Sequence, residues 1–160
     1  MEGVVIKFKS THKYAQLPLN NTHQPKAIGF SSVDETEGIA DSGSDLFSIE
    51  DVRIHPHKSA VVGIGLTLAY ITPGYWFRIE GRSGLGFKHG IQPHFGIIDN
   101  QYRGDLGIKL YNLSDVAYDI KSGDRIAQMV IYKLHEPKLE WADDVSTTSR
   151  GASGFGSSGK

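Results

Sequence analysis

The chain has 160 residues, contains no cysteine and carries a formal net charge of −1. Its length fits one domain with a sizeable core, and the lack of cysteine excludes disulfide bonds, Cys-ligated zinc and a thiol nucleophile. The balanced charge does not favour nucleic acid as a partner. Residues 1–9 lack a signal-peptide pattern, and the longest apolar stretch, 60–71, is too short to span a bilayer. We therefore expect an intracellular protein, cytoplasmic or nuclear, that binds no nucleic acid and no membrane.

The apolar pattern predicts an all-β fold. Nineteen glycines divide the chain into short segments, few of which have helical periodicity. We expect strands at residues 4–8, within 45–54, and at 61–69, 75–79, 95–98, 106–111, 116–120 and 125–134. One helical turn is expected at 82–87, and the apolar runs on either side of the polar loop 99–105 indicate a hairpin. Many short strands at this spacing are typical of a sandwich, a jelly roll or a barrel.

Three segments fall outside this strand pattern. Residues 17–38 are polar and irregular and predict a long loop, 141–149 resemble a linker, and 150–160 are rich in Gly and Ser. We expect one domain over residues 1–140 and a linker with a flexible C-terminal arm over 141–160. The arm contains Arg150 and Phe155, which suit the phosphates and the base of a nucleotide. A disordered Gly/Ser tail without a ligand is the alternative.

Two polar segments of the body are candidates for a ligand site. Arg82 and Ser83 lie between Gly81 and Gly84, where the backbone allows close approach and a guanidinium can bind phosphate oxygens. An ordinary turn with a surface arginine is the alternative. Asp99 follows an apolar strand, where it would act as a general base or merely open a turn.

Other polar side chains also have two interpretations. Tyr102 would pack under a sugar ring or across the sheet, and Gln128 would contact a ligand or bond within the sheet. His55 and His57 lack the further ligands that a metal site needs, which favours a structural or solvated role. No G-x-S-x-G motif supports serine hydrolase chemistry.

Taken in order, five segments resemble the five motifs of the trimeric dUTPases. They are ADSGSDL at 40–46, RSGL at 82–85, GIIDNQYRGD at 96–105, GDRIAQ at 123–128 and RGASGFGSSG at 150–159. The resemblance extends from residue 40 to the C-terminus. Each segment alone is unspecific, but five segments in order at fitting spacing are highly specific.

The resemblance implies a distorted, jelly-roll-like β-barrel that forms homotrimers with shared active sites. It also implies hydrolysis of dUTP to dUMP and pyrophosphate with the help of Mg²⁺. This reaction lowers dUTP and supplies dUMP for thymidylate synthesis. By position, Asp99 would activate the water that attacks the α-phosphorus, and Asp45 would hold Mg²⁺ through water.

The resemblance also assigns the residues that bind dUTP. Those in the body would be Arg82, Ser83, Gly84 and Gln128 at the phosphates, Gly96, Ile98 and Gly107 at the uracil, and Tyr102 at the deoxyribose. Those in the arm would be Arg150, Phe155, Gly156, Ser157 and Ser158. Phe155 would stack on the base, while Arg150 and the serines would cover the outer phosphates.

The chain departs from the family pattern without losing a catalytic group. The family commonly has Ala, Tyr, Pro, an acidic residue and Thr where this chain has Ser42, Ser44, Gly81, Gln101 and Ser158. Two other functions stay open. The related dCTP deaminases share the fold, but they place a carboxylate where this chain has Lys109. A nucleotide-sensing binding protein would use the long loop at 17–38.

Overall fold

The computed structural model describes residues 3–20 and 41–155. Within these residues it contains ten strands and one short helix, which confirms the predicted all-β class. The strands are β1 (Ile6–Ser10), β2 (Gly43–Phe47), β3 (Val52–Ile54), β4 (Ser59–Ile71), β5 (Tyr75–Glu80), β6 (Ile91–Pro93), β7 (Gly96–Ile98), β8 (Asp105–Asn112), β9 (Tyr118–Ile120) and β10 (Arg125–Lys133), and the helix is α1 (Ser83–His89). Most of the predicted loop at 17–38 lies outside the described residues, as do Gly156, Ser157 and Ser158.

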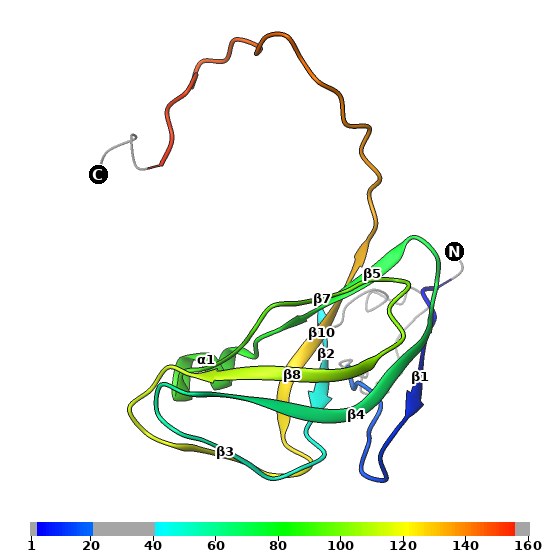
Figure 1. Cartoon of the computed structure of the whole chain (residues 1–160), viewed down its shortest axis with the longest axis vertical. Helices are drawn as coiled ribbons and strands as arrows, with labels where there is room; N and C mark the ends of the chain where they lie inside the picture. Colours follow the sequence, from blue (N-terminus) through cyan, green and yellow to red (C-terminus); the bar gives the residue numbers. More distant parts are fainter. Residues whose placement is uncertain (1–2, 21–40, 156–160) are drawn as a thin grey trace, which may run out of the picture.

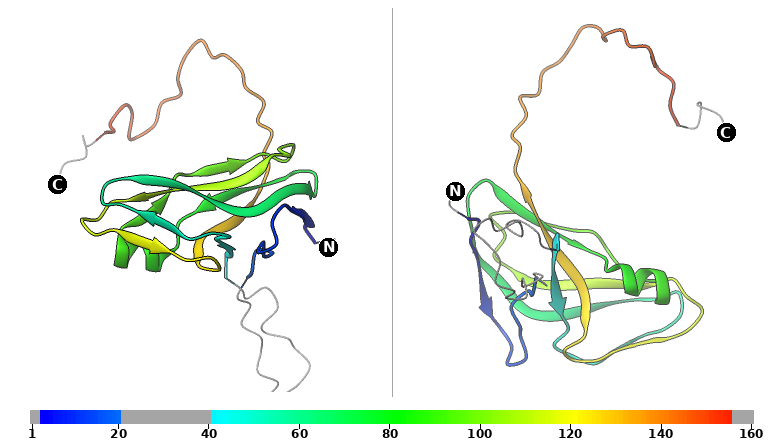
Figure 2. Two further views of the ribbon diagram at one scale, coloured as in Figure 1. Left: turned by 60° about the horizontal axis from the view of Figure 1, so that its bottom comes forward. Right: turned by 180° about the vertical axis from the view of Figure 1, so that it is seen from behind.

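The strands form antiparallel sheets in two main layers (Figures 1 and 2). One sheet has the order β1-β4-β8-β6, a second has the order β2-β10-β5-β7, and β3 pairs with β9 in a small third sheet. The helix α1 lies at one end of the layers. Because the described strands leave open edges at β1, β6, β2 and β7, the fold is jelly-roll-like and is not a closed barrel.

The hydrophobic core is built by both large sheets. Val62 and Leu110 come from one sheet and Phe77 from the other, and all three are almost completely buried. Phe8 on β1 packs edge-on against Phe77, with ring centroids 6.3 Å apart. Along β8, buried and outward-facing residues alternate, as expected for a strand with one covered face. Burying each large apolar side chain contributes about 1.5–3 kcal/mol, so this alternation fixes which face of β8 points inward.

Two elements differ from the sequence prediction. β4 extends two residues beyond the predicted 61–69 at each end, because its first residues pair with β8 and its last residues pair with β1. The glycines inside it bend the strand without ending it. The pairing with β8 shifts register between Gly63 and Thr67, and Gly65 has φ +69°, a conformation that glycine adopts without strain. β6 was not predicted, since three residues that end in proline give little strand pattern. Pro93 is tolerated because β6 is an edge strand.

The C-terminal segment leaves the sheets after β10. Figure 1 shows it leading away from both layers as an extended chain, and Trp141 and Phe155 are fully exposed. β10, the last strand within the described residues, ends at Lys133. No helix within residues 3–20 and 41–155 is long and apolar enough to cross a membrane.

Candidate functional site

A polar cavity of about 310 Å³ is lined by residues of the first, second and fourth motifs. Its walls are formed by Asp41, Ser42, Gly43, Asp45, Arg82, Ser83, Gly84 and Gln128. β2 provides the first motif, the start of α1 provides the second, and β10 provides Gln128. Segments far apart in the sequence thus meet in one hollow, as the predicted phosphate contacts require.

Strand pairing determines how these residues meet. In β10, Gln128 lies opposite Asp45 of β2 and opposite Glu80 of β5. The Gln128 side-chain amide nitrogen, Nε2, donates to the carbonyl oxygen of Gly81 at 2.7 Å. A Cβ on Gly43 would overlap the Gln128 side-chain oxygen. The glycine therefore makes room for the amide that holds the loop before Arg82.

The Asp45 carboxylate is nearly buried and is paired with two arginines. Arg82 Nε lies 2.8 Å from Asp45 Oδ1, and an Arg125 terminal nitrogen lies 3.3 Å from Oδ2. Asp45 is only 8 % exposed, and a buried carboxylate is costly unless it is paired in this way. A second Arg82 nitrogen donates to the carbonyl oxygen of Arg125 at 3.2 Å. A guanidinium has five N–H donors, so Arg82 keeps donors for an anion in the cavity.

Asp99 lies in a different part of the molecule. It borders a larger, partly apolar cavity of about 570 Å³, whose other walls are Pro73, Gly74, Tyr75, Trp76, Ile97, Asn100, Gln101 and Leu134. Asp99 itself is exposed at the end of β7. This cavity and the polar cavity have no lining residue in common. Within one chain, the structure does not bring Asp99 together with Asp45, Arg82 and Gln128.

The Asp99 segment was predicted to join a hairpin, but β7 and β8 lie in different sheets. The segment between β6 and β7 is still bonded to β8, where His94 N donates to the carbonyl oxygen of Lys109 at 2.7 Å. Beyond that bond, β7 pairs with β5 and β8 pairs with β4. The hairpin therefore opens at Gly96, Ile98 and Gly107, the three positions predicted to bind the base.

Tyr102 is bonded to the loop that connects β7 and β8. Its hydroxyl donates to the carbonyl oxygen of Asp105 at 2.9 Å. A Cβ on Gly104 would overlap the Tyr102 ring, so a side chain at this position would displace the ring. Tyr102 stays half-exposed, which leaves part of the ring available to a ligand.

One wall of the larger cavity is held by stacked aromatic rings. The rings of Trp76 and Tyr132 are stacked with centroids 4.9 Å apart. The Tyr132 hydroxyl donates to Glu80 Oε1 at 2.8 Å. This hydrogen bond to a carboxylate raises the pKa of Tyr132 above its usual value of 10.0, and desolvation adds to the shift. Tyr132 is therefore a neutral hydrogen-bond donor at neutral pH.

Of the predicted arm residues, Arg150 and Phe155 are described, and neither lines either cavity. Arg150 Nε donates to the carbonyl oxygen of Ser153 at 2.7 Å, a bond within the arm itself. Phe155 is fully exposed and has φ +48°. The predicted contacts of Gly156, Ser157 and Ser158 fall outside the described residues.

Two residues near these cavities were missed by the sequence analysis. Arg125 lies inside the fourth motif, and its position one residue after a Gly-Asp turn was the available signal. Asn100 donates two hydrogen bonds to the turn between β4 and β5, and nothing in its sequence context indicated this. Among residues 3–20 and 41–155, no group of three His, Cys, Asp or Glu side chains could hold a metal ion.

Comparison with known proteins identifies the family. The dUTPase family model matches residues 34–159. A deoxyuridine 5'-triphosphate nucleotidohydrolase from Nautilia profundicola is 46% identical over 123 residues, which cover 74% of this chain and 84% of that protein. The corresponding protein of Solanum lycopersicum is 41% identical over 118 residues, covering 74% of this chain and 69% of that protein.

A solved structure is similar over almost the whole chain. The dUTPase of Staphylococcus bacteriophage 80alpha, solved with dUPNHPP, superimposes with a TM-score of 0.76 at 27% sequence identity. The match covers 98% of this chain and 99% of the phage protein. Together, the family match, the identity to the curated relatives and the shared fold show that the chain belongs to the dUTPase family.

Proposed function

We propose that this protein is a dUTP diphosphatase, which hydrolyses dUTP to dUMP and pyrophosphate. The observation that carries this proposal is the opened hairpin, which holds exposed Asp99 at the end of β7 beside unpaired strand edges. The reaction would lower dUTP and supply dUMP for thymidylate synthesis. An intracellular location, cytoplasmic or nuclear, fits this role.

The polar cavity would bind the phosphates. Arg82 has spare donors, Ser83 adds a hydroxyl, and Gly84 has no atoms within 4 Å of where a side chain would begin, so a ligand can approach its backbone. Gln128 is held by the Gly81 carbonyl oxygen and presents its remaining polar atoms nearby. Charged and oriented donors of this kind are what phosphoryl transfer needs, since its catalysis is mostly positioning and charge stabilisation.

The opened hairpin would bind the base and the sugar. Backbone groups of β7 and β8 that do not pair with each other need other partners, and a uracil edge offers both a donor and acceptors. We assign this contact to Gly96, Ile98 and Gly107. The narrow gap would exclude the methyl group of thymine, and the Tyr102 ring would exclude a ribose 2′-hydroxyl.

Asp99 would activate the attacking water. Its carboxylate accepts a proton from the water as the oxygen bonds to the α-phosphorus. The bond from the α-phosphorus to the oxygen that bridges to the β-phosphorus breaks, and pyrophosphate leaves. An exposed carboxylate at a cavity edge is accessible to both water and substrate, and a general base of this kind contributes about 10²–10⁴-fold.

Mg²⁺ would be bound mainly by the triphosphate. No three potential ligand side chains cluster in the described parts of the chain, which fits an ion that phosphate oxygens and water largely surround. Asp45 would contribute through water. Its two ion pairs leave further lone pairs on the carboxylate oxygens. When bound, Mg²⁺ would neutralise charge on the phosphates, while Asp45 and Arg82 orient them.

A homotrimer with shared sites would join the separate parts. The sheet that contains β5, β7 and β10 exposes large apolar side chains, among them Ile97 at 64 % and Ile131 at 40 % exposure, and Phe95 beside β7 is 66 % exposed. Neighbouring chains would cover this surface. We propose that the polar cavity of one chain faces the Asp99 loop of another.

The arm would complete the site. We propose that residues 1–140 form one domain and that 141–160 form a linker and arm. Arg150, Gly156, Ser157 and Ser158 would cover the outer phosphates, while Phe155 would stack on the base. Stacking on an aromatic ring contributes about 1–3 kcal/mol, so ordering this glycine-rich segment would also need the contacts of Arg150 with phosphate.

The test is pyrophosphate release from dUTP, measured beside dTTP, dCTP and UTP, with and without Mg²⁺. We expect rapid release from dUTP with Mg²⁺ and far slower release from the other three nucleotides. Unchanged dUTP in magnesium buffer would refute the proposal. Ammonia release from dCTP would instead indicate the deaminase alternative, although Lys109 stands where that family places a carboxylate.

A further inference from the structure

The loop between β7 and β8 is tied to the body by the side chain next to Asp99. Asn100 Nδ2 donates to the carbonyl oxygens of Thr72 at 3.2 Å and of Tyr75 at 2.9 Å. Asn100 is half-buried, whereas Asp99 is exposed. One amide group thus links the Asp99 segment to the turn between β4 and β5.

That turn is itself firmly held. Thr72 N donates to the carbonyl oxygen of Val5 at 2.9 Å, and Val5 N donates to Thr72 Oγ1 at 2.8 Å. Leu134 N, at the end of β10, donates to the carbonyl oxygen of Gly74 at 2.7 Å. The turn is therefore bonded to the N-terminal segment and to the second sheet. Because the turn is held in this way, its carbonyl oxygens give the Asn100 side chain acceptors in fixed positions.

The other hydrogen bonds of the loop do not replace this link. Tyr102 N donates to the Asp99 carbonyl oxygen at 3.0 Å, and an Arg103 nitrogen donates to the Asn100 carbonyl oxygen at 2.7 Å. These bonds shape the loop but do not attach it to the body. On the other side of Asp99 the backbone is held by β7, whose Ile98 pairs with Phe77 of β5, so Asn100 is the attachment on the side of the loop. Thr67 Oγ1 donates to Asp105 Oδ1 at 2.5 Å, which secures the far end of the loop, beyond Tyr102.

We propose that Asn100 is a positioning residue that sets the place of the Asp99 carboxylate relative to the body. This inference rests on the proposed role of Asp99 in dUTP hydrolysis. Asn100 touches neither substrate nor water in this role and acts through the backbone it shares with Asp99. A displacement of about 1 Å at a catalytic group can cost 10²-fold in rate, so two hydrogen bonds at the adjacent residue can control turnover.

The primary test compares N100D and N100A with the wild type. N100D keeps the shape of the side chain but turns a donor into a carboxylate that faces two carbonyl oxygens. We expect kcat to fall about 10–100-fold in both variants. KM for dUTP should change less than about threefold, because a displaced Asp99 carboxylate lowers kcat while the groups proposed to bind dUTP are unchanged. A wild-type kcat, or a rise in KM alone, would overturn the proposal.

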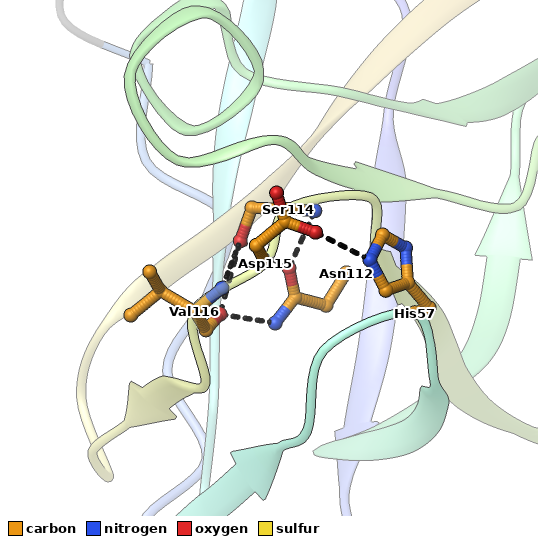
Figure 3. Close-up of polar contacts among 5 residues, drawn as sticks. All are labelled: His57, Asn112, Ser114, Asp115 and Val116. Atoms are coloured by element: carbon orange, nitrogen blue, oxygen red, sulfur yellow. Dashed lines mark hydrogen bonds and ion pairs between the residues drawn. The ribbon is translucent and has the colours of Figure 1, made fainter.

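Asn112 provides a matched control (Figure 3). Its Nδ2 also donates to two carbonyl oxygens, those of Ile54 at 2.9 Å and Val116 at 2.8 Å, but at the end of β8 away from Asp99. We expect N112A to lower Tm while kcat, measured below the melting transition, stays within about twofold of the wild type. If N112A does not fold, S114A removes the bond from Ser114 Oγ to Asn112 Oδ1 as a milder control. An equal loss of kcat in the control would reduce Asn100 to a general stabilising role.

A second measurement does not depend on activity. The Tyr102 amide proton is bonded to the Asp99 carbonyl oxygen, so its hydrogen exchange reports order in this segment. We expect faster exchange of this amide in N100D than in the wild type, with unchanged exchange in the core of β8. Unchanged exchange at Tyr102 would overturn the positioning role. If the wild type does not hydrolyse dUTP but the Tyr102 amide exchanges faster in N100D, the proposed function is refuted. The conclusion that Asn100 orders the Asp99 segment is then still supported.

Discussion

At the scale of single residues, two aspartates differ sharply in their surroundings. Asp45 is nearly buried and bonded by two guanidinium groups, whereas Asp99 is exposed at the edge of a cavity. A carboxylate with both oxygens in ion pairs is held in one orientation and has little surface open to a ligand. The exposed carboxylate of Asp99 can be reached by both water and substrate. The surroundings alone thus favour Asp99 as the base and Asp45 as an orienting group.

This difference predicts the effect of replacing Asp99. We expect D99N to lower kcat by at least about 10²-fold, since the amide cannot accept the proton. Binding of a non-hydrolysable dUTP analogue, measured by calorimetry, should change little because Asp99 contributes no phosphate contact. Near-normal turnover by D99N would exclude the proposed general-base role.

A second prediction at this scale concerns Gly43. A methyl group at this position would overlap the Gln128 side chain and displace it from the Gly81 carbonyl oxygen. We expect G43A to raise KM for dUTP about tenfold and to lower Tm, because an overfilled site shifts its neighbours. G3A, at a glycine with open space around it, is the control. Wild-type KM in a folded G43A would contradict the assignment of Gln128 to the phosphate cavity.

The sequence indicated the residue types of the site better than their contacts. Arg82, Asp45 and Gln128 were predicted as ligand-binding residues, and the structure places all three around one cavity. The pairing of Arg125 with Asp45 was not predicted, because it depends on the register between β2 and β10. Asn100 escaped prediction for the same reason: its acceptors lie more than twenty residues earlier in the chain.

At the scale of elements, strand partners explain why the hairpin prediction was incomplete. The apolar runs near 95–98 and 106–111 were both found as strands, β7 and β8. An apolar run shows that a strand is buried but does not choose its partner. β7 pairs with β5 and β8 with β4, and this divergence opens the gap assigned to the base. The gap that we propose as the base site therefore depends on strand pairing, which local sequence does not encode.

The contact between two loops leads to a prediction of pH dependence. Asp51, before β3, accepts a hydrogen bond from Ser122 N at 2.9 Å, and Lys121 Nζ lies 3.3 Å away. The backbone hydrogen bond, followed by Lys121, lowers the pKa of Asp51 below its usual 3.8. Because the folded pKa is lowered, the stabilisation is present above the unfolded value and is lost as the pH falls through the folded value.

We therefore expect D51N to have a slightly lower Tm than the wild type at pH 7. The difference should shrink as the pH falls below 3.8, where the wild-type carboxyl group becomes neutral as well. Thermal melts of both proteins between pH 7 and the lowest pH at which they fold would measure this. A Tm difference that is independent of pH would show that the charge of Asp51 does not stabilise this contact.

At the scale of the whole molecule, the separation of the two cavities and the path of the arm suggest shared sites. Neither cavity alone is lined by both Asp99 and the residues that we propose to bind phosphate. The arm extends away from its own sheets (Figure 1). Sequence patterns describe one chain and cannot show which surface a second copy covers. The prediction of a homotrimer therefore rested only on the family resemblance. Exposed apolar residues such as Phe95 and Ile97 indicate where such a contact would form.

Mixed assemblies test this arrangement directly. D99N chains keep the arm but lack the base, and chains cut after residue 149 keep the base but lack the arm. Each variant alone should be nearly inactive. If a site takes Asp99 from one chain and the arm from another, an equal statistical mixture should regain about one quarter of wild-type activity. That fraction is the chance that a truncated chain supplies the base and a D99N chain supplies the arm.

The mixture must be prepared by co-expression or by unfolding and refolding together, and differently tagged chains should be purified in tandem to prove that they share one assembly. Combining the two variants without exchange provides the baseline, which should equal the sum of their residual activities. If base and arm came from the same chain, every site would lack one of them, and mixed assemblies would stay at that baseline. Recovery of activity in mixed assemblies would therefore show that the arm of one chain reaches a site containing Asp99 of another chain. A measurement on a single chain could not show this.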